Sequence, residues 1–332
     1  MVRKAPKIRR WVPILMSLAS LATWPIHGAD WKRHTGACDA SAAAALTETL
    51  FATASDEDNV LRVYRRGQDG PPVAQFDLSR FLEVGRKLET DLEGAARIGD
   101  LVFWIGSHSR NEQGEPRPAR HVLFATAIRG GDTAVRLEPH GRPFTGLVRA
   151  MAATPALASL ALDRAADRPG EAPGGLNIEA LAAGEDGALL IGFRNPVPGG
   201  RALVVPLLNP VDVLAGGPPR FGAPQTPDLG GLGIRDMARV AGGYCIVAGP
   251  AVGGGRHRLY SWSGATGVPK ELRKAIPKEF QAEAIVVTET GNTTAIDLLS
   301  DDGGARVAGR RCEEIKDANL RAFRELRIGR PE

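Results

Sequence analysis

Short apolar runs separated by turn residues recur along this chain at intervals of roughly 50 residues. In each copy, an acidic residue precedes an apolar-rich run, and a Gly, Asp or Asn turn leads into a second run. The three clearest copies share an acid-to-glycine offset of 13 residues, from Glu93 to Gly106, Glu179 to Gly192 and Asp236 to Gly249. Weaker copies run from Ser41 to Ala54 and, with a longer turn, from Glu283 to Ser300. This recurrence indicates a repeat architecture.

Each copy predicts β-strands rather than a helix, because its apolar runs are short and bounded by turn residues. A third apolar run follows after a loop, at 60–64, 122–126, 202–206 and 259–262. One sheet of three or four strands per roughly 40–50 residues is typical of a propeller blade. A β-sandwich is the alternative, but it gives no reason for a fixed offset. The sequence therefore predicts an all-β fold, a single β-propeller.

The predicted blades cover residues 36–80, 91–143, 177–225, 232–270 and 281–328. A short helical insertion is expected around 154–167, with Thr154 as its N-cap and Pro155 at its first helical position. A sixth, degenerate blade could lie within this insertion, so five and six blades both stay open. A further helical piece is expected at 318–326.

Residues 1–29 have the pattern of an export signal. Basic residues precede an apolar stretch from Trp11 to Ile26, and Ala29 offers a small residue before Asp30. An uncleaved N-terminal anchor and a twin-arginine signal are alternatives. No other segment is apolar enough to span a bilayer. We therefore expect residues 30–332 to form one periplasmic or secreted propeller domain, with no membrane contact beyond the signal.

Charge narrows the choice of partners. The net charge is +4, and part of it lies in the first ten residues, so the remainder is close to neutral. This balance gives no indication of nucleic-acid binding. The expected partner is a small molecule or metal ion, and the protein is expected to be a monomer.

An exported chain can form a disulfide, and this chain has three cysteines, Cys38, Cys245 and Cys312. Cys38 lies in the first predicted blade and Cys312 in the last, and ring closure brings these blades together. A Cys38–Cys312 disulfide would therefore fasten the ring. Cys245 lies in an apolar run and is expected to be a buried thiol. No cysteine pair has metal-ligand spacing, which disfavours a zinc site.

Several segments closely resemble a bacterial family known only as domain of unknown function 3616. They are CDASAAAAL (38–46), SDEDNVLRVYRR (55–66), DLEGAA (91–96), WIGSHSRN (104–111), GGLNIEALA (174–182), IGFRNP (191–196), LGGLGIR (229–235) and LLSDDG (298–303). The resemblance covers nearly all of the chain after the signal. One departure is Ala180, where the family pattern leads us to expect glycine. The family is distantly reminiscent of phytase-like and esterase-like propellers. The resemblance implies the propeller fold and supplies no activity.

The predicted fold gathers carboxylates on one face. Loops that lead into the innermost strands and loops between the second and third strands open on the same side of a propeller. The first set supplies candidate ligands for Ca²⁺, an ion that prefers oxygen ligands, at Asp39, Asp91, Glu93, Glu179, Asp236 and Glu283. Their mutual repulsion would favour a bound cation or raised pKa values. Alternatively, each carboxylate accepts backbone N–H groups of a neighbouring blade and fixes the register between blades.

The loops between second and third strands supply candidate ligand-binding residues, which are Arg110, Asn111, Arg194, Asn195, Asp56, Asp58, Asp301 and Asp302. The two arginines occupy corresponding loops and could clamp a phosphate or carboxylate, or pair with a glutamate of the adjacent blade. His108 is the catalytic candidate, as general base or metal ligand; the alternative is a hydrogen-bonded loop histidine. Ser107 is a poor partner for it, because adjacent strand residues point to opposite sides.

Three functions follow as hypotheses. The first is a propeller that binds a small anionic or metal-bridged ligand on its axial face. The second is a Ca²⁺-assisted hydrolase of phosphoesters, carboxyl esters or lactones, with a polarised water as nucleophile. The third is a structural or protein-binding propeller. No residue in the sequence is diagnostic of turnover.

Overall fold

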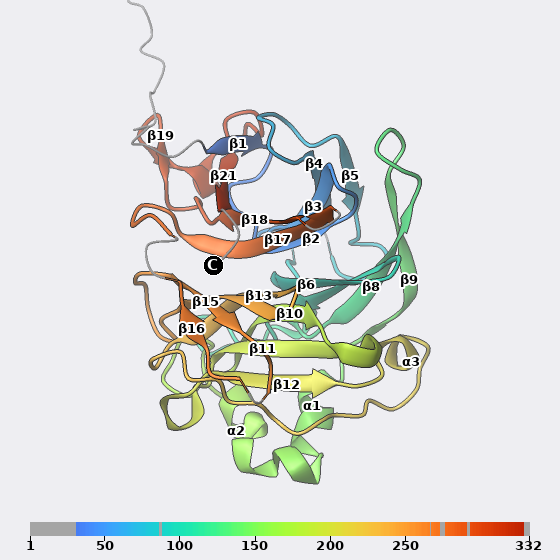
Figure 1. Ribbon diagram of the computed structural model, residues 1–332, viewed down its shortest axis with the longest axis vertical. Coiled ribbons are helices and arrows are strands. Elements are labelled where there is room, and N and C mark those ends of the chain that lie inside the picture. The colour runs from blue at the N-terminus through green and yellow to red at the C-terminus, as the bar shows by residue number, and fades with distance from the viewer. Residues whose placement is uncertain (1–30, 86–87, 266, 273–275, 291–292, 329–332) are drawn as a thin grey trace, which may run out of the picture.

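Five antiparallel sheets surround one axis and form a five-bladed β-propeller (Figure 1). The computed structural model describes residues 31–85, 88–265, 267–272, 276–290 and 293–328. The innermost strands contact one another in cyclic order, and they are β2 (Ala42–Ala45), β6 (Leu92–Ile98), β10 (Asn177–Ala183), β13 (Gly233–Val240) and β17 (Ala282–Thr290). Each is the end strand of its sheet. The predicted propeller is confirmed, and the blade number is five.

The remaining strands complete the blades outward from the axis. Blade 1 adds β3 (Leu50–Ala54), β4 (Val60–Arg65) and β5 (Ala74–Asp77), and blade 2 adds β7 (Leu101–Gly106), β8 (Leu123–Arg129) and β9 (Arg136–Phe144). Blade 3 adds β11 (Leu189–Asn195) and β12 (Leu203–Leu207), and blade 4 adds β14 (Gly243–Gly249), β15 (Arg258–Trp262) and β16 (Lys270–Glu271). Blade 5 adds β18 (Thr293–Ser300), β21 (Ala322–Ile328) and β1 (Lys32–Thr35), and a separate ribbon pairs β19 (Arg306–Val307) with β20 (Arg310–Arg311).

Strand alternation explains why these segments are apolar throughout. Successive side chains of a strand point to opposite faces of its sheet. In β7, Phe103 and Ile105 enter the core shared with blade 3, whereas Val102 and Trp104 enter the core shared with blade 1. Each blade packs against a neighbour on both faces, so both sets of positions must be apolar.

The helical insertion lies between β9 and β10, below β12 in Figure 1. It consists of α1 (Leu147–Ala152), a 3₁₀ helix at Pro155–Leu160 and α2 (Leu162–Ala166). The predicted helical insertion is confirmed, and Ala161, with a left-handed φ of 47°, separates its two later pieces. Thr154 precedes the 3₁₀ helix but makes no side-chain cap.

A third short helix, α3 (Pro210–Leu214), follows β12. The predicted helical piece at 318–326 is wrong, because most of this segment belongs to β21.

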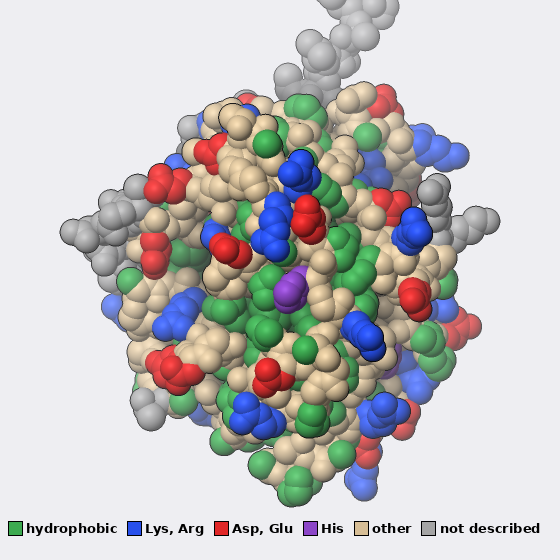
Figure 2. All heavy atoms as spheres, turned by 90° about the vertical axis from the view of Figure 1, so that its right-hand side faces the viewer, with side chains coloured by type: hydrophobic (Ala, Val, Ile, Leu, Met, Phe, Trp, Pro, Cys, Tyr) green, Lys and Arg blue, Asp and Glu red, His purple; other side chains and the backbone are tan. Residues whose placement is uncertain are grey.

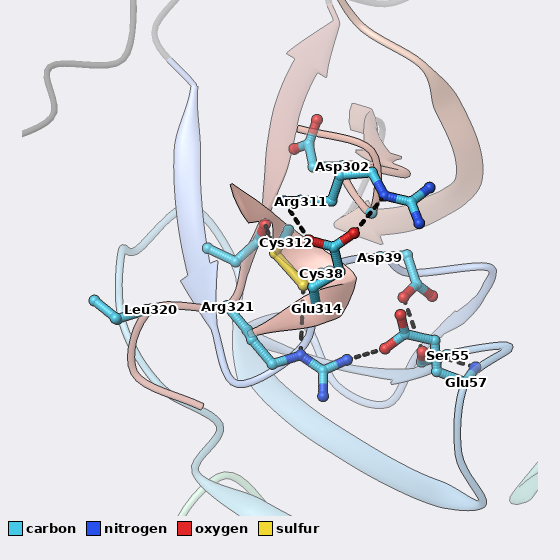
Figure 3. The surroundings of a disulfide bond; sticks show 12 residues. Cys38, Asp39, Ser55, Glu57, Asp302, Arg311, Cys312, Glu314, Leu320 and Arg321 are labelled. Carbon is cyan, nitrogen blue, oxygen red and sulfur yellow. Dashed lines mark hydrogen bonds and ion pairs between the residues drawn. A yellow bond between two sulfur atoms is a disulfide. The ribbon is translucent and has the colours of Figure 1, made fainter. Parts of the chain in front are cut away.

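Pairing between the first and last strands of the chain closes the ring. β1 pairs with β21 and is the outermost strand of blade 5, although it precedes blade 1 in sequence. Close by, a disulfide joins Cys38 to Cys312, whose Cα atoms are 5.8 Å apart (Figure 3). Cys245 is a buried free thiol. A disulfide at this position suits an oxidising compartment.

The proposed export signal at 1–29 lies outside the described residues. Among the helices that the structure describes, none is long and apolar enough to cross a membrane. Figure 2 shows one face of the molecule, where hydrophobic side chains gather near the middle and charges of both signs are interspersed around them.

Candidate metal centre

A β-bulge recurs near the start of four innermost strands. The register with the second strand shifts around Glu93 in β6, Glu179 in β10, Arg235 in β13 and Glu283 in β17. A bulge leaves one residue without a cross-strand partner and re-aims its side chain. Four blades therefore contribute one charged residue each at equivalent positions around the axis.

The strand pairing shows that Asp236 is not equivalent to Glu93 and Glu179, although all three have the same offset to a glycine. Ala180, one residue after Glu179, pairs with Gly192, and Asp236 likewise pairs with Val247. Asp236 therefore lies one residue beyond the bulge, and Arg235 occupies the position of the glutamates. The Asp236 carboxylate accepts hydrogen bonds from the N–H of Met237 (2.7 Å) and from Ile285 of blade 5 (2.6 Å).

Three carboxylates from two adjacent blades converge at the same end of the axis. Asp56 belongs to the loop between β3 and β4, Asp91 immediately precedes β6, and Glu93 is the bulge residue of β6. One oxygen of each lies within 4.8 Å of one oxygen of the other two. Asp91 adopts a left-handed φ of 52°, a strained conformation for a residue with a side chain. We call Asp56, Asp91 and Glu93 the acidic triad.

The acidic triad is poorly compensated by positive charge. Asp91 accepts a hydrogen bond from Ser107 and forms an ion pair with Arg120 at 2.9 Å. Asp56 and Glu93 accept no hydrogen bond from any residue within the described ranges. Burial raises the pKa of both carboxyls well above the usual range, and neighbouring carboxylates add to the effect. Burial also raises the pKa of Asp91, although Arg120 opposes it.

The other two ring glutamates are held by arginines. Arg235 contacts Glu179 (Nε–Oε2, 3.0 Å) and also forms a close ion pair with Glu283. Arg194 adds a 3.1 Å contact to Glu179. Burial nevertheless raises the pKa of Glu179 to about 7. This half of the ring carries compensated charge, in contrast to the acidic triad.

Asp39 and Asp301 extend the acidic surface toward the ring closure. Asp39 forms a β-bridge with Asp301 and accepts hydrogen bonds from Ser41 (3.0 Å) and Ser55 (2.8 Å). Burial, followed by the charge of Asp301, raises the pKa of Asp39 to about 6. Figure 3 shows Asp39 and Ser55 near the disulfide, where Arg321 lies between Cys38 and Glu57.

The other predicted ligand-binding residues contact protein groups. Asp58 pairs with Arg62, and Asp302 pairs with Arg324. Arg110 donates to the carbonyl oxygen of Ala166 and to the carboxylate of Asp167. Arg194 donates to the carboxylate of Glu171 and to the carbonyl oxygens of Pro250 and Gly253. Asn111 donates to the carboxylate of Glu115, and Asn195 donates to the carbonyl oxygens of Gly170 and Ala172. These contacts tie the loops to one another and to the helical insertion.

His108 is buried, with only 1% of its surface exposed. Its Nδ1 lies 2.9 Å from the carbonyl oxygen of Gly106, and burial lowers its pKa to about 3. The ring is therefore neutral at physiological pH. Its Nε2 contacts no hydrogen-bond partner in the described part of the chain.

Three residues of the site were not among the predicted ligand-binding, metal or catalytic residues. Arg235 and Arg120 neutralise ring carboxylates, and only the strand register identifies the first of them. Asn177 donates to Glu179 at 2.7 Å, but its buried Oδ1 has no hydrogen-bond partner among the described residues. The N–H of the next residue, Ile178, donates to the carbonyl oxygen of Ser107. Asn177 therefore adjoins the loop whose Ser107 holds Asp91.

Comparison with known protein families identifies the family of this chain. The profile of a family described as protein of unknown function (DUF3616) matches residues 39–122 and 132–298. No match was found among curated proteins.

Among solved structures, the chain is similar to glutaminyl cyclase from Myxococcus xanthus, with 12% identity, a TM-score of 0.45, and 90% of this chain and 94% of that chain covered. It is also similar to the allergen Mala s 1 from Malassezia sympodialis, with 10% identity, a TM-score of 0.46, and coverages of 90% and 95%. PQQ-bound aldose sugar dehydrogenase from Streptomyces coelicolor gives 10% identity, a TM-score of 0.42, and coverages of 91% and 99%.

Proposed function

The chain belongs to the DUF3616 family, and for this member we propose an exported propeller that binds a divalent cation at the acidic triad. We propose Ca²⁺ as the ion and a small anionic ligand as the group that it bridges to the protein. Asp56, Asp91 and Glu93 supply the carboxylate oxygens. Export is supported by the disulfide and by the basic and apolar pattern of residues 1–29.

The observation that carries this proposal is the unbalanced charge of the acidic triad. Three carboxylates lie within 4.8 Å of one another, and Arg120 contacts one of them. Close carboxylates cannot all ionise at low cost unless a cation lies between them. A bound divalent ion would remove this repulsion and would lower all three pKa values.

The number of ligands favours an open site. Ca²⁺ takes six to eight oxygen ligands, whereas three carboxylates supply roughly three to six. The remaining positions are then available to water or to an anion. A ligand that carries phosphate or carboxylate oxygens would meet the ion from the open face of the propeller.

Titration of metal-free protein with CaCl₂, followed by calorimetry and by thermal unfolding, tests the proposal. A ligand at 100 times its Kd stabilises a protein by about 2.7 kcal/mol, so the unfolding temperature should rise by several degrees. Glu93→Gln should abolish this rise. Because the substitution also removes repulsion, metal-free Glu93→Gln should be at least as stable as metal-free wild type.

The matched control is Glu138→Gln on the outer strand β9, where the side chain is 54% exposed; it should respond to Ca²⁺ like wild type. Inorganic phosphate should bind only when Ca²⁺ is present. If Glu93→Gln instead destabilises the protein equally with and without Ca²⁺, the carboxylate is structural and the proposal fails.

A further inference from the structure

A cavity opens at the end of the propeller axis opposite to the acidic triad. It has a volume of about 670 Å³ and is lined by the later residues of all five innermost strands. The acidic triad adjoins the starts of these strands, so the two sites lie at opposite ends of the channel. Small side chains line much of the cavity, and they include Ala43, Ala45, Ala96, Ala182 and Ala238. We call this cavity the alanine funnel.

The wall of the alanine funnel offers hydrogen-bonding groups. Each innermost strand is an end strand, so part of its backbone has no partner strand on the axial side. One side chain adds a specific signal, because the Thr288 hydroxyl has no hydrogen-bond partner in the described residues although Thr288 is only 6% exposed. A buried polar group without a partner costs free energy. A polar ligand atom in the funnel would satisfy it.

The mouth of the funnel carries charges of both signs. Glu289 of blade 5 and Glu48 next to blade 1 are exposed on neighbouring blades, whereas Arg97 and Arg239 belong to blades 2 and 4. The mouth therefore carries both signs of charge, and Arg97 reaches from blade 2 to the Leu46 carbonyl oxygen of blade 1. None of the four forms an ion pair with another residue that the structure describes.

Both guanidinium groups are anchored by the backbone. Arg97 donates to the carbonyl oxygens of Leu46 (2.6 Å) and Gly99 (2.8 Å), and Arg239 donates to that of Gly184. Each retains N–H groups beyond those used in these bonds. Positioned cations and exposed carboxylates around one mouth are complementary to a molecule that carries both charges.

We propose that the alanine funnel binds a small zwitterion of the amino-acid or short-peptide type. Its carboxylate lies toward Arg97 and Arg239, and its ammonium group lies toward Glu48 and Glu289. The narrow wall selects small side chains, and Thr288 hydrogen-bonds to the body of the ligand. The size of the funnel falls within the usual range for small-molecule sites, about 300–1,000 Å³. This site is independent of the cation site proposed above.

Calorimetric or NMR titration with L-alanyl-L-alanine tests the proposal on the intact protein. The control ligand is N-acetyl-L-alanine methylamide, which has similar hydrogen-bonding groups but no charge. We expect saturable binding of the dipeptide and at least tenfold weaker binding of the control. The double variant Glu48→Gln/Glu289→Gln should weaken dipeptide binding by about tenfold or more, whereas Glu138→Gln should leave it unchanged.

Variants of Thr288 test whether the ligand binds inside the funnel or only at its mouth. Thr288→Val removes the hydroxyl at similar volume and should weaken binding by roughly fivefold, the scale of one hydrogen bond, whereas Thr288→Ser should retain it. Chelation of metal should not alter dipeptide binding, which distinguishes this site from the acidic triad. Absence of saturable dipeptide binding, equal binding of the uncharged control, or unchanged affinity in both Thr288→Val and the double variant would each overturn the proposal.

Discussion

Replacing Arg235 by methionine tests whether the ring is held together by compensated charge. The guanidinium contacts Glu179 and Glu283, which are 2% and 5% exposed. Burial opposes the charged form of Arg235, but these two carboxylates raise its pKa above the usual value. Methionine retains much of the length of the side chain and none of its charge. The variant therefore leaves two buried carboxylates without the cation that joins them.

The loss in the free energy of unfolding caused by Arg235→Met depends on pH. The pKa of Glu179 is about 7 with Arg235 in place, against about 4.3 in an unfolded chain, so ionisation in the folded state costs roughly 3–4 kcal/mol relative to the unfolded chain. This cost is absent below pH 4, where both states are protonated, and grows as pH rises toward the folded pKa. Removing Arg235 raises that pKa further. At pH 8 we therefore expect a loss of about 3–5 kcal/mol in the free energy of unfolding.

At pH 5 the Glu179 carboxyl is protonated in the folded state, so the loss should shrink to about 1–2 kcal/mol from missing hydrogen bonds. Urea unfolding under non-reducing conditions at pH 5 and pH 8 measures both values, provided that the slope with denaturant is unchanged. Arg136→Met on β9, where the side chain is 68% exposed, is the control and should change little. An equal loss at both pH values, or a loss below about 1 kcal/mol at pH 8, would refute the reasoning.

Other measurements address the remaining features. Ca²⁺ affinity should fall from pH 8 to pH 5, because the raised pKa values of Asp56 and Glu93 let protons compete for the same oxygens; an affinity independent of pH in calorimetry would contradict this. Asp236→Ala should destabilise by about 1–3 kcal/mol because the buried N–H of Ile285 loses its acceptor, and Ca²⁺ binding should persist; loss of binding at unchanged stability would make Asp236 a ligand instead. Cys38→Ser should cost about 2–5 kcal/mol in denaturant unfolding, and a smaller loss would show that strand pairing alone holds the ring. Gly233→Ala places a Cβ against the carbonyl oxygen of Arg194 and should lower the unfolding temperature markedly, whereas Gly254→Ala, with open space around it, should not; equal effects would contradict the tight packing at Gly233.

The repeated strands were predictable because each blade must bury both faces of a short sheet. Apolar runs bounded by turns therefore appear at every blade, and the third strands β4, β8, β12 and β15 lie where the sequence predicts them. The segment at 318–326 was misassigned because its pairing partners, β18 and β1, are distant in sequence. Local pattern carries no information on such pairing.

The candidate site was predictable in position but only partly in detail. Acidic residues lie at strand starts and in loops that share one face, and the sequence pattern alone is enough to locate them. A bulge, however, shifts the register by one residue, and a fixed offset cannot detect it. The predicted repeat therefore placed Asp236 at the position that Arg235 occupies in the fold. The distinction between uncompensated Glu93 and compensated Glu179 depends on arginines brought in by the fold.

β1 also protects the molecule from its own copies. Without it, β21 would end blade 5 with a row of unpaired N–H and C=O groups, a surface on which another chain can add a strand. β1 is only four residues long and begins with Lys32 and Arg33. Short, charged strands are poor templates for further pairing. A chain that begins after residue 36 would therefore be prone to edge-to-edge association.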